Sequence, residues 1–182
     1  MIALVELEES LVAACQLWFA EFKAFTGRKD EEGKPLYGEL NIYQGFLPLN
    51  TADESEEIPP NYYPHLVIRS KSGSFDDNVH SVEVVFELGA VDNAVDQSGY
   101  RDIRNMIQRL TTGLRTQTLV NGFPIDPKSV KWELIGDNEL YPSWHGEVTA
   151  TYKVKAPQSV LLTELAKAGP FNWVEEQLRQ GA

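Results

Sequence analysis

A short segment in which apolar and polar side chains alternate constrains the fold of this chain more than any other feature. Over residues 79–88, every second side chain from Val82 to Leu88 is apolar, and Glu83 and Glu87 fall on the opposite side. Successive side chains of a β-strand point to opposite faces of its sheet. The segment is therefore predicted to be a strand with one buried face and one face in water.

Similar alternation elsewhere predicts two β-hairpins. Residues 63–69 precede the first strand, and the loop between the two is rich in turn-forming residues, as a hairpin requires. Residues 130–135 and 148–154 predict a second hairpin, with a long loop over 136–146. A further short strand is expected over 40–47.

Apolar residues at three- and four-residue steps predict two long helices. The first is expected over residues 4–25, with Gly27 just past its end. The second is expected over 98–120, with Asp102 near its positive end and Gly122 beyond its last turn.

These elements predict a single α+β domain over residues 1–182, with its core in 63–157 and two short carboxy-terminal helices in 158–180. Two amphipathic helices on one face of a mainly antiparallel sheet of four or five strands would bury every apolar stripe. Residues 28–36 and 50–61 are expected to be loops. The second loop contains paired prolines and four acidic residues that are candidate interaction residues, Asp53, Glu54, Glu56 and Glu57.

The net charge limits the kinds of partner that the chain can bind. Sixteen basic and 27 acidic residues give a formal charge of −11. Nonspecific binding to nucleic acid requires clustered cations that displace phosphate counterions, and an acidic surface repels phosphate. The one basic concentration is spread along the predicted helix 98–120 and consists of Arg101, Arg104, Arg109 and Arg115. We expect no membrane partner, because no apolar run is long enough to cross a bilayer.

No pattern of catalytic or cofactor-binding residues stands out. Glu83 and Glu87 share a strand face about 13 Å apart, which is too far for a retaining glycosidase pair and is typical of a solvated face. The single Cys15 and three dispersed histidines, His65, His80 and His145, do not have the spacing of a metal site. Phosphate-binding and dinucleotide-binding glycine motifs are absent too. We therefore expect no catalytic residues, no metal, no cofactor and no enzyme activity.

Aromatic residues in the expected loops are candidate contact residues. Tyr62, Tyr63, Tyr141 and Trp144 fall there, and exposed aromatics often anchor a protein partner. Such residues also pin loops to a core. Among them, Trp144 is a candidate for interaction, together with Glu83 and Glu87 of the alternating strand.

Two segments carry a resemblance to a known family. Residues 91–102 read Val-Asp-Asn-Ala-Val-Asp-Gln-Ser-Gly-Tyr-Arg-Asp between a strand and a helix, and residues 140–146 read Leu-Tyr-Pro-Ser-Trp-His-Gly. In this order they resemble the tail-terminator, or tail-completion, proteins of long-tailed siphophages. The similar part covers about residues 63–157.

The resemblance implies a structural protein of the virion. Members of the family are α+β domains that assemble, typically six at a time, into a ring at the head-proximal end of the tail tube. The ring ends tube growth and contacts the tube protein and the head-completion protein, while DNA passes through its channel. By position, the family motif falls on Asp96, Gly99, Tyr100, Asp102, Tyr141, Pro142 and Gly146, which we expect to be structural.

Two other hypotheses about function compete with that of a structural virion protein. The chain could be a monomeric acidic module that binds a basic protein, for example as a DNA mimic, and it would then remain a monomer. A small carboxylate enzyme would instead require a concave pocket with a carboxylate of raised pKa.

Overall fold

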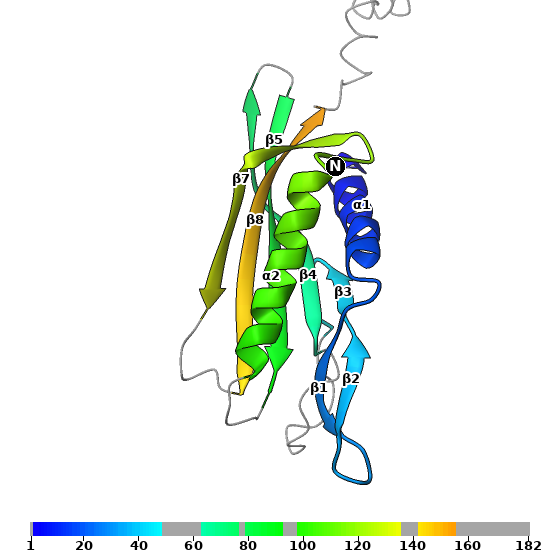
Figure 1. The fold of residues 1–182 in the computed structure, drawn as a ribbon. Coiled ribbons are helices and arrows are strands. Elements are labelled where there is room, and N and C mark those ends of the chain that lie inside the picture. Colours follow the sequence, from blue (N-terminus) through cyan, green and yellow to red (C-terminus); the bar gives the residue numbers. More distant parts are fainter. Residues whose placement is uncertain (1, 49–62, 77–78, 93–97, 136–141, 156–182) are drawn as a thin grey trace, which may run out of the picture.

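The computed structural model describes residues 2–48, 63–76, 79–92, 98–135 and 142–155. It has the predicted mixture of helices and strands (Figure 1). In chain order the elements are α1 (Ile2–Trp18), β1 (Lys23–Lys29), β2 (Pro35–Glu39), β3 (Asn41–Gln44), β4 (His65–Asp76), β5 (Val79–Val91), α2 (Ser98–Thr116), β6 (Leu119–Val120), β7 (Phe123–Ile135) and β8 (Ser143–Lys155).

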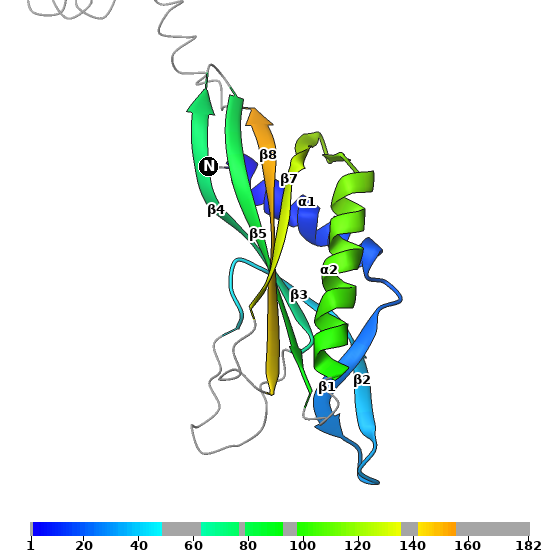
Figure 2. The ribbon, with the colours of Figure 1, turned by 60° about the vertical axis from the view of Figure 1, so that its left-hand side comes forward.

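The strands form one curled sheet and a separate hairpin (Figure 2). The sheet has six strands in the order β3-β4-β5-β8-β7-β6, and the hairpin consists of β1 and β2. All neighbours in the sheet are antiparallel except β3 and β4, which run parallel. The expected antiparallel sheet of four or five strands is thus too small, and it lacks the parallel pair. Both predicted hairpins, β4–β5 and β7–β8, are confirmed.

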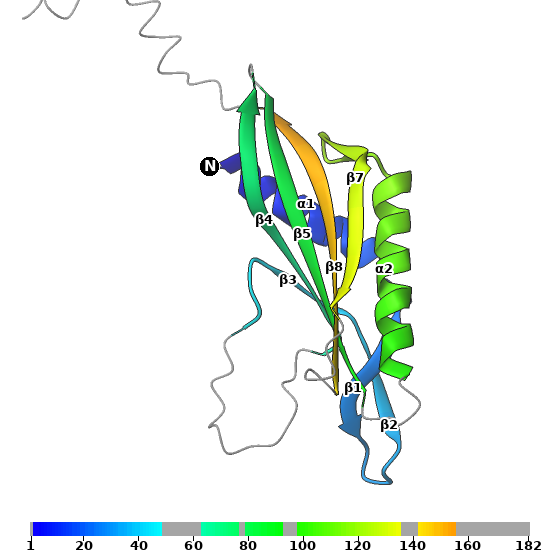
Figure 3. The same ribbon diagram turned by 90° about the vertical axis from the view of Figure 1, so that its left-hand side faces the viewer.

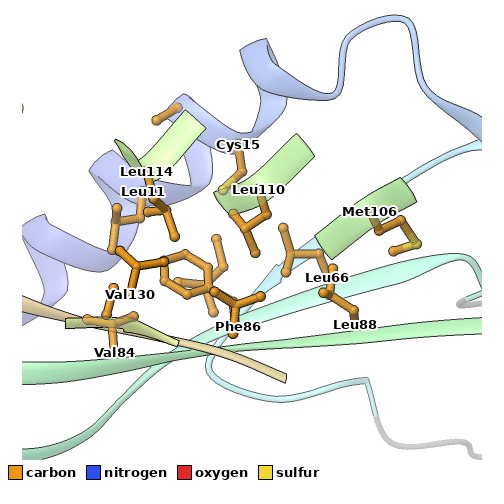
Figure 4. Packing of buried hydrophobic residues seen from close by; sticks show 14 of the residues in the cluster. Leu11, Cys15, Leu66, Val84, Phe86, Leu88, Met106, Leu110, Leu114 and Val130 are labelled. Atoms are coloured by element: carbon orange, nitrogen blue, oxygen red, sulfur yellow. The ribbon is translucent and has the colours of Figure 1, made fainter. Parts of the chain in front are cut away.

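Both helices pack on the same face of the sheet (Figure 3). From β5, Val84 and Phe86 project into the space where Leu11 of α1 and Leu110 of α2 meet them (Figure 4). All four side chains are fully buried in one continuous cluster. Burying each such side chain contributes about 1.5–3 kcal/mol. The alternation along β5 therefore sets which face of the sheet the helices cover.

The first helix is shorter than predicted. It ends at Trp18 rather than at residue 25, and Phe25 lies on β1, where its side chain is nonetheless buried. The apolar spacing over 4–25 fits a helix throughout, but pairing of Phe25 with Tyr37 of β2 determines the backbone of this segment. Gly27 accordingly lies inside β1 instead of terminating a helix.

Residues 28–36, expected to be a loop, largely belong to the β1–β2 hairpin. The side chain of Asp30 accepts hydrogen bonds from the backbone N–H groups of Glu32 and Lys34, at 2.9 Å and 2.8 Å. Such local bonds favour a turn over a continued strand. The predicted strand 40–47 is reduced to β3, which ends at Gln44. The next residue, Gly45, has a φ of 80° and turns the chain away from the strand direction.

The second helix ends four residues earlier than predicted, at Thr116. Asn121 and Gly122 both have positive φ, 45° and 85°, and connect β6 to β7 through the pair Val120–Phe123. A two-residue turn with two positive φ angles matches the twist of a hairpin, and Asn-Gly is its preferred sequence. Gly122 therefore serves a hairpin and not the end of α2.

A side chain from α1 occupies part of one outer edge of the sheet. Strand β3 covers β4 only up to Ile68. Beyond it, Glu8 accepts a hydrogen bond from the backbone N–H of Ser70 at 2.7 Å and another from the Gln44 amide at 3.1 Å. A carboxylate thus satisfies a strand-edge donor that would otherwise be open to another chain.

Some predicted elements lie outside the described residues. These are the carboxy-terminal helices in 158–180 and the loop 50–61 with Asp53, Glu54, Glu56 and Glu57. In the part of the chain that the structure describes, neither helix is long and apolar enough to cross a membrane.

Shortening Leu110 tests the packing of α2 on the sheet. Because this side chain is fully buried, Leu110→Ala should lower the free energy of unfolding by about 2–5 kcal/mol. The matched control is Leu17→Ala, which removes a side chain that is 78% exposed and should change stability by less than about 0.5 kcal/mol. Denaturant titration measures both, and equal effects would contradict the packing described.

Candidate functional site at the amino end of helix α2

The two segments that carry the family resemblance meet at the amino end of α2. Gly99 is buried there, and an added Cβ would lie 2.4 Å from Cδ1 of Trp144 and 2.8 Å from Cβ of Asp92. Real Cβ atoms do not approach so closely, so these contacts require glycine. The backbone N–H of Asp92 also donates to the carbonyl of Pro142, at 3.0 Å. The end of β5, the start of α2 and the start of β8 are therefore fixed against one another.

Trp144 lies on β8, contrary to the prediction that it belongs to a loop. Its indole Nε1 is buried without a hydrogen-bond partner among the described residues. Its ring meets Tyr100 edge to face, with 6.1 Å between centroids. The Arg104 guanidinium in turn lies 5.6 Å from the centre of the Tyr100 ring. Trp144 thus packs the junction together, while Tyr100 and Arg104 form its exposed side.

Gly146 allows α2 to approach β8 closely. A Cβ at this position would lie 3.0 Å from Cδ1 of Ile107 and 3.1 Å from Cγ2 of Ile103. Both isoleucines are buried on the inner side of α2. Within the described residues, Gly99, Pro142 and Gly146 therefore have structural contacts, whereas Asp96 and Tyr141 of the same motif lie outside them.

Asp102 joins α2 to the protruding hairpin. Its carboxylate accepts a hydrogen bond from the backbone N–H of Phe25 on β1. Burial raises the pKa of Asp102, the nearby charge of Asp92 raises it further, and the bond from Phe25 opposes both effects. The sequence suggested a role at the positive helix end, but the contact with β1 makes Asp102 a tether between two layers.

A second cluster lies on the opposite face of the sheet. His65 and His145 both pair with Gly89 across three adjacent strands, and their ring centroids are 6.2 Å apart. Tyr63 stacks near both, at 5.0 Å and 6.3 Å. An added Cβ at Gly89 would collide with the His65 ring at 2.2–2.8 Å. The two histidines are far apart in the sequence, so only the pairing register of the strands could have predicted that their rings lie close together.

Burial governs the protonation of these histidines. Burial and, to a smaller extent, the neighbouring His145 together lower the pKa of His65 to about 4. Burial likewise lowers the pKa of His145, but Glu87 acts in the opposite direction. Both rings are consequently neutral at pH 7.

Three glutamates stand in a row beside the histidines. Glu87 of β5 lies opposite Glu147 of β8, which lies opposite Glu133 of β7. Arg69 forms an ion pair with Glu87. Glu83, the other predicted interaction residue of β5, is on the same face but opposite Thr151. Like charges directly opposite one another destabilise a sheet, so a cation bound beside this row would stabilise it.

Comparison with known proteins adds no family assignment. No protein-family model matches the sequence, and no curated protein matches it either. Among the residues the structure describes, no three His, Cys, Asp or Glu side chains come together as a group that could hold a metal ion.

The contact between Gly99 and Trp144 can be tested by a double-mutant cycle. Gly99→Ala should destabilise the protein by about 1–3 kcal/mol, because the new methyl group overlaps the indole. In a Trp144→Ala background the same change should cost less than half as much, since the obstructing ring is gone. Denaturant titrations of the four proteins give the coupling, and additive effects would contradict the contact.

The neutral state of His65 predicts a pH dependence of stability. Its pKa is about 4 in the folded chain and about 6.5 when unfolded, so in this window the unfolded state binds more protons. Stability should fall as the pH drops from about 6.5 towards about 4. His65→Asn should flatten this slope, whereas the control His80→Asn should preserve it. Thermal unfolding at stepped pH measures both, and an unchanged slope in His65→Asn would contradict the assignment.

Proposed function

We propose that this chain is a phage tail-terminator protein that forms a ring at the head-proximal end of the tail tube. The observation that carries the proposal is the contact between Gly99 and Trp144. It joins the two segments whose residues resemble that family, although 45 positions of sequence separate them. The Asp92–Pro142 hydrogen bond supports the same junction. Among the described residues, the two segments thus meet in one structural unit, which supports reading them as parts of one motif.

The exposed surface supports an assembly role. Large apolar side chains are exposed on several elements, among them Leu17 at 78%, Tyr37 at 63% and Trp132 at 57%. Aromatic side chains of this kind are enriched in protein interfaces. On the outer edge of β7, residues 127–135 are not covered by β6, which pairs only with Phe123 and Pro124. Such an edge is available for pairing with a neighbouring subunit.

In the proposed ring, copies join head to tail and the rotation between them closes on itself. The ring ends growth of the tail tube and contacts the tube protein on one side and the head-completion protein on the other. The excess of acidic residues has a use there, because carboxylates lining a channel repel phosphate and let DNA pass without sticking.

Deleting the gene for this chain from its parent phage tests the function directly. Without a terminator, tails should have uncontrolled lengths and should fail to join filled heads. Supplying the protein from a plasmid should restore uniform tails. Electron microscopy of normal-length tails attached to heads in the deletion would reject the terminator assignment.

The glutamate row favours a second candidate function. Glu87, Glu133 and Glu147 form a compact acidic strip on one face, as an acidic module or DNA mimic would need for binding a basic protein. Such a protein would act as a monomer. A purified chain that remains monomeric at every concentration and captures a basic partner would favour this candidate over a ring subunit.

A further inference from the structure

The outer side of α2 carries three arginines that lack an ionic partner. Arg101, Arg104 and Arg109 are exposed, and within the described residues none of them forms an ion pair. With 3.6 residues per turn, the three positions spread over an arc of about 140° on the outer half of the helix, and Arg104 and Arg109 stand at its two borders. Arg115 differs, because a cation in the last turn is stabilised by the helix dipole. In a chain of net charge −11, three unpaired cations on one helix are unexpected.

Aromatic neighbours hold two of these arginines in place. The Arg104 guanidinium lies 5.6 Å from the Tyr100 ring centre, and that of Arg109 lies 5.6 Å from the Phe22 ring centre. A hollow runs along each side of α2, one beside Trp132 and Arg104, the other beside Phe22 and Arg109. Arginine, tryptophan and tyrosine dominate the energetics of protein interfaces. This mixture suits a protein partner better than the phosphate backbone of DNA.

The opposite face of the same molecule carries matching charge. Of the glutamate row on β5, β8 and β7, Glu87 is paired with Arg69. Glu133 and Glu147 are directly opposite each other and, among the described residues, form no ion pair. Adjacent carboxylates repel each other, so a cation arriving from outside the chain would relieve this repulsion.

The free charges of the two surfaces have similar spacing. Arg101 and Arg104 are three residues apart, which is about 4.5 Å along a helix axis. Glu133 and Glu147 lie on neighbouring strands, which are about 4.8 Å apart. The planar guanidinium groups of arginine match carboxylates in bidentate pairs.

We propose that the outer side of α2 on one copy binds the glutamate row on the sheet face of a second copy. The inference rests on the proposed ring and names the surfaces that would build it. Figure 3 shows α2 on one side of the sheet, and the row lies on the other side, because its glutamates alternate with buried residues such as Phe86 and Val148 along the strands. The contact is therefore heterologous, as closure into a ring requires. It fixes orientation more than affinity and weakens as salt rises.

A charge-swap experiment tests the pairing. The first variant, Arg101→Glu with Arg104→Glu, carries acid on both surfaces, and the second, Glu133→Arg with Glu147→Arg, carries cations on both. Each alone should associate with itself about tenfold or more weakly than the unmodified chain. An equimolar mixture should recover association, because every helix surface then meets a sheet surface of opposite charge. Sedimentation velocity over a concentration series, at low and high salt, measures these differences.

Two controls distinguish a specific loss of association from misfolding and from a general effect of charge. Arg28→Glu with Lys29→Glu makes the same change of charge on the hairpin and should leave association unchanged. Circular dichroism melting of each variant checks that it is folded. If both charge variants associate as the unmodified chain does, the surfaces named here are wrong, while the ring remains supported. If the unmodified chain never associates, the ring itself fails. If it binds duplex DNA through these arginines at physiological salt, the helix surface is a nucleic-acid surface and the inference is overturned.

Discussion

The close approach of α2 to the sheet is the constraint on which the remaining architecture depends. Gly99 and Gly146 leave space for Trp144 and for the isoleucines of α2, so the helix lies directly on β5 and β8. A side chain at Gly99 would overlap the Trp144 ring, and one at Gly146 would press on both isoleucines. Because the inner side of α2 packs on the sheet, its arginines lie on the outer side. The arginine surface is thus a consequence of how the helix packs on the sheet.

The same contact divides the molecule into two unlike faces. The helices cover the face of β5 that presents Val84 and Phe86, where only apolar groups can be buried at little cost. Glu87 and Glu147 of the central strands lie on the other face, together with the histidine pair. The burial of His65 shows that this face is not uniformly open to water. The glutamate row and the arginines of α2 consequently lie on opposite sides of the sheet.

Apolar patterns within single segments predicted the elements whose structure depends mainly on burying one face. The alternation along β5 and the helical spacing of α2 gave both elements with bounds close to those observed, because burial of one face leaves a direct mark on the sequence. The segment around Phe25 was assigned to a helix, since its spacing fits either structure and only pairing with Tyr37 decides between them. The parallel β3–β4 pair, the histidine pair and the glutamate row depend on register between distant strands. No single segment contains that information.

Glu8 has a consequence for how the sheet meets other chains. By occupying the Ser70 N–H just beyond the end of β3, it removes one backbone donor from the margin of β4. At the opposite margin, β6 pairs with β7 only at Phe123 and Pro124. A strand from another chain that paired with β4 beside β3 would have to displace this carboxylate, so pairing at that point is disfavoured. A single carboxylate in the first helix in this way makes the two margins of the sheet unequal as places for a further strand.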